Sequence, residues 1–392
     1  MKRNQKEFLE RLVPQMQRAG IDALLLTSPD AVFYATGFAT AIPYQTGKLG
    51  LSTAVVTKDG SAYVFCTEFE KQNAALSVDP AFVQIHTYPT WVFIEDYTKP
   101  GEKKEVVNNP LKTYEMAVEV IPDREHAVIG VEPNALPFKP YNYLVSVFGQ
   151  THIVDCAEVL REARVIKTPW EIENLRKAAH YTELAMLQTA HEIVPGMTEA
   201  DVFQIYNQRC WAQSNEVMDV FKAHTVGRNF APACIPRAGR IERGDIIRLD
   251  GGVKVNAYNA DIARTFAVGK TVEKREYIYD TLYRGFEAGK RCLGPGEPMC
   301  NAFFEVQRVV AERGIEGYIR GHHGHSLGCS RSPEEAPYLA PGEKRLLEPG
   351  MVFCMEVPYY SSRNHSYNIE DTFVITPDGV EFFSVAPPSL YL

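Results

Sequence analysis

The sequence predicts an α/β (α+β) protein of two domains, a small N-terminal α/β domain and a larger C-terminal domain with pseudo-twofold symmetry. The chain has 392 residues, more than a single hydrophobic core usually supports. The spacing of its apolar residues changes from a strand period to a helix period near Thr168. In the second half, residues 194–210 and 294–310 each open with Pro-Gly and continue as an amphipathic helix, and strand-like segments follow both. Two such halves around one shared sheet would bring residues from both to a central site.

The N-terminal domain is built from elements that local patterns indicate. An apolar stripe predicts the opening helix, short apolar runs predict buried strands, and Asp59-Gly60 is typical of a hairpin turn. A polar segment with prolines is expected to lie on the surface. In chain order we expect a helix, a strand, a hairpin, the surface segment and a second buried strand at residues 8–16, 22–28, 53–66, 94–115 and 126–133.

A strong helix start marks the boundary between the domains. Thr168 is a favourable N-cap, Pro169 suits the first helical position, and Glu171 stands where a capping box requires it. We place the linker at about residues 157–167 and the domains at residues 1–157 and 165–392.

The composition excludes several classes of protein. A formal net charge of −8 argues against a nucleic-acid or anionic-membrane partner. No apolar run approaches the length that spans a bilayer, and the N-terminus lacks the apolar core of a signal peptide. The eight cysteines include no CxxC pair, which indicates free thiols and a cytoplasmic protein. Cys329 invites a nucleophile interpretation, but a small packing residue in a tight turn explains it better.

Four acidic residues stand in strand-like surroundings where patterning alone would not place them. They are Asp250, Asp261, Glu356 and Glu370. A carboxylate inside an apolar strand is costly to bury unless it is paired or binds a cation, although a single one can face outward from a strand edge. Together with one glycine-bracketed histidine, four carboxylates are the ligand set of a site for two divalent ions, and this set suits Mn, Co, Fe(II) or Zn.

The amino-acid sequence of these segments resembles the creatinase/prolidase/aminopeptidase P family. The resemblance rests on "ARVIKTPWEIENLRKAA", "LDGGVKVNAYNADIARTF", "GHSLG", "MEVP" and "IEDTFVI", and on "PDAVFYATGF" for the N-terminal domain. It implies a catalytic half with the pita-bread fold, an N-terminal creatinase/prolidase-like domain and a homodimer. It also implies the metal ligands Asp250, Asp261, His325, Glu356 and Glu370. His325 is chosen because it alone stands in a Gly-His-x-x-Gly frame.

The chain departs from the peptidase members of this family at two histidines. One is expected in the loop 227–245, which holds none; Ala233 or Cys234 lies nearest its place, and His224 comes several residues too early. The other would follow the ligand histidine, where this chain has Ser332. In the peptidases these histidines stabilise the developing oxyanion and protonate the leaving amine. Their absence therefore suggests a changed substrate. "GHSLG" looks more like the creatinase and dimethylsulfoniopropionate lyase branches, although creatinase-type enzymes are metal-free.

Other residues are candidates for the roles that these two histidines have in the peptidases. His322 and His323 are candidate proton carriers, although a solvent-facing or supporting position suits each as well. Glu334 or Glu335 is a candidate general acid or base, or else a solvated acidic pair. The arginines that would hold a substrate carboxylate are Arg331, Arg237 and Arg240. The aromatic residues that would line the pocket are Tyr359, Tyr360, Tyr44 and Trp91. Tyr258 and Arg264 are expected to support the metal aspartates.

The sequence therefore predicts a cytoplasmic, dimeric metal-dependent hydrolase that cleaves a C–N bond in a small substrate. That substrate is a Xaa-Pro peptide or an amide or amidine compound. Two alternatives keep the fold: a lyase that abstracts a proton from a small zwitterion, and a metal-free creatinase-like amidinohydrolase. A third is a non-enzymatic binding protein, but a set of five ligands argues against it.

Overall fold

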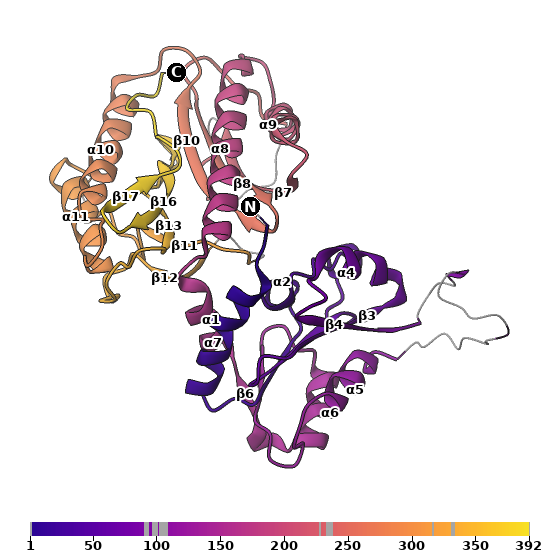
Figure 1. The fold of residues 1–392 in the computed structure, drawn as a ribbon. Helices are drawn as coiled ribbons and strands as arrows, with labels where there is room; N and C mark the ends of the chain where they lie inside the picture. Colours follow the sequence, from indigo (N-terminus) through magenta and orange to yellow (C-terminus); the bar gives the residue numbers. More distant parts are fainter. Residues whose placement is uncertain are drawn as a thin grey trace. The chain divides into compact units, whose positions relative to one another are not determined.

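The fold is described from a computed structural model of the chain. It describes residues 2–89, 94–95, 101, 109–226, 229–232, 238–315, 317–330 and 334–391, without the side chains of residues 221–226. The chain divides into two compact units, Met1–Arg164 and Val165–Leu392, each with its own hydrophobic core (Figure 1). Within the described ranges, no helix has both the length and the apolar character needed to cross a membrane.

The first unit is a six-stranded mixed sheet with helices packed on it (Figure 1). Its strand order is β4-β3-β2-β1-β5-β6; the pairs β1–β2 and β2–β3 are antiparallel and the others parallel. The elements are α1 Gln5–Arg18, β1 Ala23–Leu26, α2 Pro29–Thr36, α3 Ile42–Thr46, β2 Thr53–Thr57, β3 Ala62–Thr67, a 3-10 turn Glu68–Glu70, α4 Lys71–Ser77, β4 Val83–Tyr88, α5 Lys112–Glu119, β5 Ile129–Val131, α6 Phe138–Phe148, a 3-10 turn Gln150–His152, β6 Ile153–Asp155 and α7 Ala157–Val165.

The predicted opening helix, hairpin and two buried strands of this unit are present, but the end of the expected surface segment begins α5 and buries Thr113 and Tyr114. α1 buries four of the apolar residues expected on one face, while Val13 is only half-buried. β1 is fully buried, and β2 and β3 form the predicted hairpin with Gly60 at its turn in the left-handed conformation, φ 87°. Most of the expected surface segment 94–115 lies outside the described residues.

The link between the units differs from the expected one. Residues 157–165 form the helix α7, which buries Val159, Leu160 and Ala163 on one face. The capping box at Thr168 is confirmed: its hydroxyl accepts a hydrogen bond from the Glu171 N–H at 3.2 Å, and its own N–H donates to the Glu171 carboxylate at 2.7 Å. The non-helical link is therefore only the short stretch between α7 and α8.

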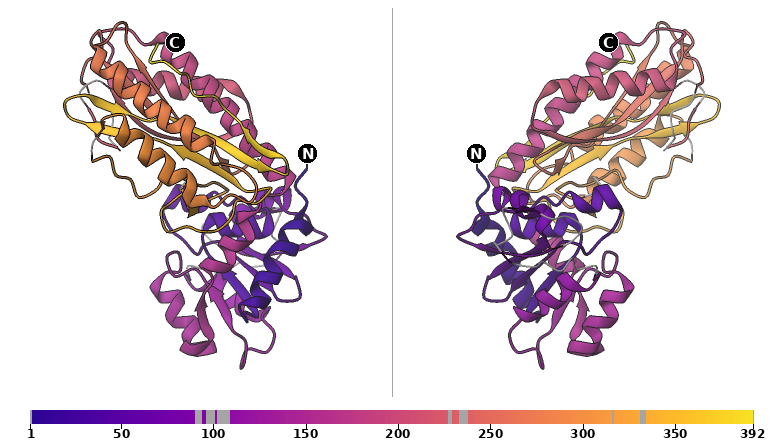
Figure 2. Two further views of the ribbon diagram at one scale, coloured as in Figure 1. Left: turned by 90° about the vertical axis from the view of Figure 1, so that its left-hand side faces the viewer. Right: turned by 90° about the vertical axis from the view of Figure 1, so that its right-hand side faces the viewer.

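The second unit is a larger sheet with two pairs of helices (Figures 1 and 2). The strand order among described residues is β12-β11-β13-β16-β10-β8-β7, with β17 paired to β16 and β9 to β8, while β14 and β15 pair separately. The elements are α8 Pro169–Glu192, α9 Glu199–Gln213, β7 Val217–Val226, β8 Ile246–Val255, β9 Tyr258–Asn259, β10 Ile262–Ala267, α10 Glu273–Lys290, α11 Met299–Glu312, β11 Gly324–Ser326, β12 Glu335–Tyr338, β13 Val352–Glu356, β14 Tyr359–Ser361, β15 His365–Tyr367, β16 Glu370–Thr376 and β17 Gly379–Phe382.

This unit has the two-halved arrangement that the sequence predicts. One core joins α8 and α9 to β8 and β10, and a second joins α10 and α11 to β13 and β16. Figure 2 shows the α10–α11 pair nearer the viewer from one side and the α8–α9 pair from the other. The two halves meet where β10 pairs with β16, and Ala263 with Glu370 is the backbone register pair between these strands. The polar site lies along this seam.

Candidate metal centre

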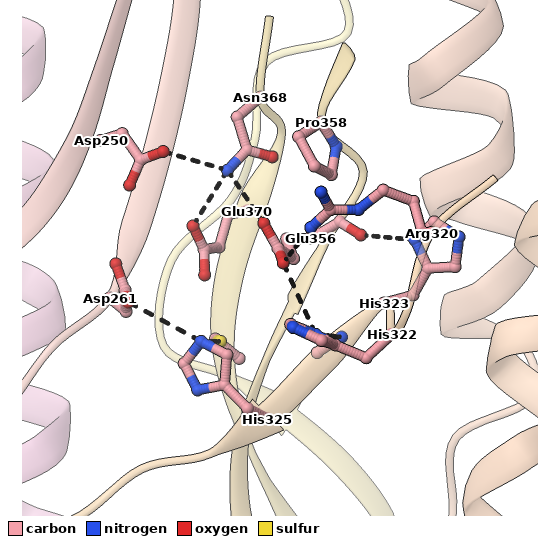
Figure 3. A network of polar contacts seen from close by, with 12 residues as sticks. Asp250, Asp261, Arg320, His322, His323, His325, Glu356, Pro358, Asn368 and Glu370 are labelled. Carbon is pink, nitrogen blue, oxygen red and sulfur yellow. Dashed lines mark hydrogen bonds and ion pairs between the residues drawn. The ribbon is translucent and has the colours of Figure 1, made fainter. Parts of the chain in front are cut away.

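The five expected ligands come from five neighbouring segments of the second sheet. Asp250 lies on β8, Asp261 immediately precedes β10, and His325 lies on β11. Glu356 is the last residue of β13 and Glu370 the first of β16. Figure 3 shows all five side chains directed toward one region. The structure thus brings together every ligand that the resemblance implies.

The strand register explains this convergence. Asp250 pairs with Ala263, which also pairs with Glu370. Glu370 in turn pairs with Glu356. Because directly paired residues project from the same face of a sheet, these carboxylates form one row across four strands. His325 joins the same face one strand further along, because β11 pairs with β13.

Burial makes this row of carboxylates costly without a cation. Asp261 and Glu370 are 5% and 2% exposed. Burial raises the pKa of Asp261 well above the ordinary carboxyl range, and the nearby charges of Asp250 and Glu356 raise it further. Burial likewise raises the pKa of Glu370, and the charge of Asp261 adds to the effect. One oxygen of Asp261, Oδ1, is buried and has no hydrogen-bond partner among the described residues. Such a cluster fits one or more divalent cations.

His325 is oriented as a metal ligand would be. Its Nδ1 lies 3.1 Å from the Ser326 carbonyl and donates to it, which leaves the Nε2 lone pair facing Asp261 Oδ2 at 3.8 Å. Gly324 permits this position, because its φ is 154° and a Cβ there would lie 2.2 Å from the carbonyl oxygen of Cys354. Burial also lowers the pKa of His325, so the imidazole is held neutral, as a ligand must be.

Among the described residues, two groups of donor atoms are compact enough to hold an ion. Atoms of Asp250, Asp261 and Glu370 all lie within 4.8 Å of one another. Atoms of His325, Cys354 and Glu370 form the second such group, and Glu370 belongs to both. The residues present therefore fit divalent metal ions, and the oxygen and imidazole donors suit the transition metals expected from the sequence.

The comparisons with known proteins bear on this donor set. Residues 173–377 match the profile of metallopeptidase family M24, and residues 9–166 match the creatinase/prolidase N-terminal domain. The first match covers more than half of the chain. The chain belongs to metallopeptidase family M24.

Relatives that align with almost the whole chain agree with this membership. An uncharacterized peptidase, YqhT of Bacillus subtilis, is 27% identical over 98% of this chain and 99% of its own. A Xaa-Pro dipeptidase of Pyrococcus furiosus is 26% identical over 96% of this chain and 97% of its own. The solved structure of a Xaa-Pro dipeptidase from Bacillus anthracis superposes with a TM-score of 0.81 at 23% identity, covering 99% of both chains. The predicted pita-bread fold and the metallohydrolase class are confirmed, and the family uses divalent metal ions.

Three residues of this M24 centre were not predicted, and each stands two positions before an expected ligand. The buried Arg248 donates from Nη1 to Asp250 Oδ2 at 2.6 Å. Asn368 donates from Nδ2 toward Asp250, Glu356 and Glu370 at 3.2–3.3 Å (Figure 3). The third of these residues is Cys354, which stands two positions before Glu356. Arg248 and Cys354 share a strand with the ligand that follows them, and in a strand positions i and i−2 share a face, so the sequence period carries the signal for these two.

Arg320 is a further residue that the sequence analysis missed. Its Nη2 donates to Glu356 Oε1 at 2.7 Å (Figure 3). It precedes β11 in an irregular segment, where no side-chain period indicates which way it points. Two guanidinium groups thus balance two of the four carboxylates, Arg248 at Asp250 and Arg320 at Glu356.

Arg264 and Tyr258, expected to support the metal aspartates, form their hydrogen bonds with other residues. Arg264 Nη1 donates to the Glu370 carbonyl at 2.8 Å, and Arg264 Nη2 donates to Asp371 and Glu183 at 2.7 and 2.6 Å. Arg264 therefore fixes the backbone of the shared ligand. Tyr258 donates to Glu171 Oε1 at 3.0 Å, so it supports the start of α8.

The two histidines before the ligand have different environments. His323 is fully buried between Phe303 and Tyr318; its Nδ1 lies 2.9 Å from the Glu356 carbonyl and its Nε2 2.8 Å from Gln307. Burial lowers its pKa to about 4. With both nitrogens engaged in the core, this position does not suit the proton carrier considered from the sequence. His322 is partly exposed, with Nδ1 3.6 Å from Glu356 Oε1, so it is the better placed of the two.

The remaining candidates lie at varied positions. Glu334 is exposed, and Glu335 accepts from the Ser330 N–H at 3.1 Å. Tyr360 lies beneath the Arg248 guanidinium at 5.4 Å, and Tyr359 packs on Tyr367. Tyr44 is half-exposed in the first unit. Arg240 is exposed and donates to the Gly196 carbonyl. Outside the described residues are Trp91, Ala233, Cys234, Arg237, Arg331, Ser332 and the side chain of His224.

Proposed function

We propose that the chain hydrolyses the amide bond before proline in short Xaa-Pro peptides, using two divalent ions. The observation that carries this proposal is the row of buried carboxylates with His325 on one sheet face. The expected ligands are Asp250, Asp261, His325, Glu356 and Glu370, and the expected metals Mn, Co, Fe or Zn. Full-length relatives named Xaa-Pro dipeptidase support the substrate class.

The chain's own residues would orient and protonate the substrate. When bound, divalent ions polarise the scissile carbonyl and lower the pKa of water. His322 accepts a hydrogen bond from the Gly324 N–H at Nδ1, over 3.3 Å, so its neutral ring carries a proton at Nε2. We assign this proton to the leaving proline nitrogen, a role that needs a partly exposed acid at the edge of the centre.

The lyase and metal-free amidinohydrolase alternatives have no support in the named relatives. We also propose that the enzyme is a cytoplasmic homodimer, as the resemblance implies. The described cysteines are all free thiols, in keeping with a reducing compartment: Cys66, Cys156, Cys210, Cys292, Cys300, Cys329 and Cys354.

A peptide panel tests the proposed substrate class. Chelator-treated enzyme is reloaded with Mn, Co, Fe or Zn and given Xaa-Pro dipeptides beside matched Xaa-Ala dipeptides. We expect metal-dependent release of proline and at least tenfold weaker cleavage of the alanine series, about 1.4 kcal/mol in transition-state binding. Absence of proline release with every metal would refute the proposal.

A further inference from the structure

The C-terminal segment, residues 383–390, packs against the elements that present the metal centre. It follows β17 and buries Ala386 and Leu390 in the core that includes β13 and β16. Four groups near its start donate hydrogen bonds of 2.6–3.0 Å to α8 and β16: the Phe383 N–H to the Thr372 carbonyl, Ser384 Oγ to Asp371 Oδ1, the Val385 N–H to Glu183 Oε1 and the Ala386 N–H to Asp371 Oδ2. The segment therefore holds two carboxylates and the strand that begins at Glu370.

The two carboxylates, Asp371 and Glu183, face one guanidinium. Arg264 Nη2 donates to both of them, at 2.7 and 2.6 Å, and both Arg264 and Asp371 are buried. Two negative charges beside one positive charge repel each other in such a setting, and their oxygens need further donors. The C-terminal segment supplies these donors, because three of its four hydrogen bonds end on these two carboxylates.

The same guanidinium holds the backbone of an expected ligand. Arg264 Nη1 donates to the carbonyl of Glu370, the residue that both groups of donor atoms share, at 2.8 Å. A second route leads to Asp261: Thr372 Oγ1 donates to the Asp261 carbonyl at 2.9 Å, and the Thr372 carbonyl accepts the Phe383 N–H. Both routes fix the backbone from which a ligand side chain projects, and such supports orient a ligand without touching the metal.

We propose that the C-terminal segment is a positioning element of the metal centre, with Ser384 as its principal positioning residue. The inference rests on the proposed metal-dependent function and leaves its five expected ligands unchanged. Ser384 fixes the Asp371 carboxylate, Asp371 fixes the Arg264 guanidinium, and Arg264 fixes the Glu370 carbonyl. Loss of the first bond lets each later member shift, so the position of Glu370 becomes less well defined.

Ser384→Ala tests this chain of contacts by removing one buried hydroxyl. In the full-length protein titrated with cobalt(II), we expect the metal affinity of this variant to fall about tenfold, as it does when other supports of a ligand are lost. The visible absorption bands of the bound cobalt should also shift, because they depend on ligand geometry. Ser389→Ala is the matched control, since the Ser389 hydroxyl bonds to the Tyr391 N–H instead, and it should change neither.

A pair of variants at Val385 tests the contact with Glu183. The Val385 side chain is 73% exposed, whereas its N–H donates to Glu183. Val385→Pro removes this N–H and should weaken cobalt binding in the same direction as Ser384→Ala. Val385→Ala keeps the N–H and should bind cobalt like the wild type. Should Ser384→Ala not fold, the difference between these two variants decides.

Thermal unfolding of the same samples separates positioning from a structural role. If Ser384→Ala melts at a lower temperature but binds cobalt with unchanged affinity and spectrum, the segment is only structural and the inference is overturned, whether or not the wild type releases proline. If affinity and spectrum change as expected while the wild type cleaves no dipeptide, the positioning role stands and the proposed function fails. A wild-type protein that binds no metal overturns both.

Discussion

At the scale of single residues, the Asp261 carboxylate has a hydrogen-bonding capacity that the described residues leave unused. Its side chain is buried, one oxygen has no donor among the described residues, and burial raises its pKa well above the ordinary range. The carboxylates of Asp250 and Glu356 add repulsion. A bound cation would relieve all three costs at once.

Replacing Asp261 should separate metal binding from folding. In Asp261→Asn we expect metal content near zero and activity reduced more than about 100-fold, because a direct ligand matters more than its supports. The metal-free variant should remain folded, since one buried charge is removed. Elemental analysis and circular dichroism check both. Glu10→Gln, an exposed carboxylate on α1, is the control and should change neither.

His322 should affect catalysis without affecting stability. Loss of a general acid lowers kcat by about 10²–10⁴-fold, so His322→Gln should fall in this range with unchanged metal content. His126→Gln, an exposed histidine of the first unit, is the control. Steady-state kinetics with a proline dipeptide provides the measurement, and an unchanged kcat would assign the proton to another residue.

His323 should affect stability instead. In His323→Phe the Gln307 amide and the Glu356 carbonyl lose their partners, so the free energy of unfolding should fall by about 2–4 kcal/mol in denaturant titrations. The pKa of His323 is lowered from 6.5 to about 4. The unfolded chain therefore binds more protons in that window, and wild-type stability should decrease as pH falls from 6.5 toward 4, by about 3 kcal/mol. That part of the pH dependence should be absent in the variant.

At the scale of elements, the pairing of β11 with β13 determines the positions of His325 and Cys354 together. Gly324 opens β11 with φ 154°, and its backbone lies so close to β13 that no side chain fits. One glycine thus sets the approach of two strands and of the donors opposite each other on them.

Gly324→Ala should weaken the centre by displacing a strand. The new Cβ would contact the Cys354 carbonyl, so we expect a loss of about 1–3 kcal/mol in unfolding free energy and weaker metal binding. Gly294→Ala is a matched control, because a Cβ there meets no atom within 4 Å. Equal stability of the two variants would contradict the strand argument.

Elements also show what the sequence could and could not predict. The cap at Thr168 and the hairpin at Asp59-Gly60 depend on local chemistry, and both are found. The five expected ligands could be proposed because acidic residues in apolar strands stand out and their segments resemble a known family. Cys354 was missed because a thiol looks ordinary in a strand, even though its spacing was informative. Asn368 was missed because it lies in the short link between β15 and β16, where no strand period applies. His322 and His323 could not be distinguished, since they precede β11 in a bend with no period.

At the scale of the whole molecule, the sequence predicts a pair of chains. The homodimer is an expectation from the resemblance, so sedimentation equilibrium should give twice the 44.1 kDa mass of one chain. The mass should be independent of metal loading, because the expected ligands all lie in one chain. A monomer at micromolar concentration would contradict this prediction.

The seam between the two halves has a consequence for how the protein is made. The backbone register between β10 and β16 consists of the pair Ala263 with Glu370, and Glu370 is the donor that both groups share. During synthesis, Asp250 and Asp261 emerge long before this residue does. A nascent chain therefore holds an incomplete set of donors until the ribosome has passed Glu370, and metal capture becomes a late step of maturation that reports a correctly joined second unit.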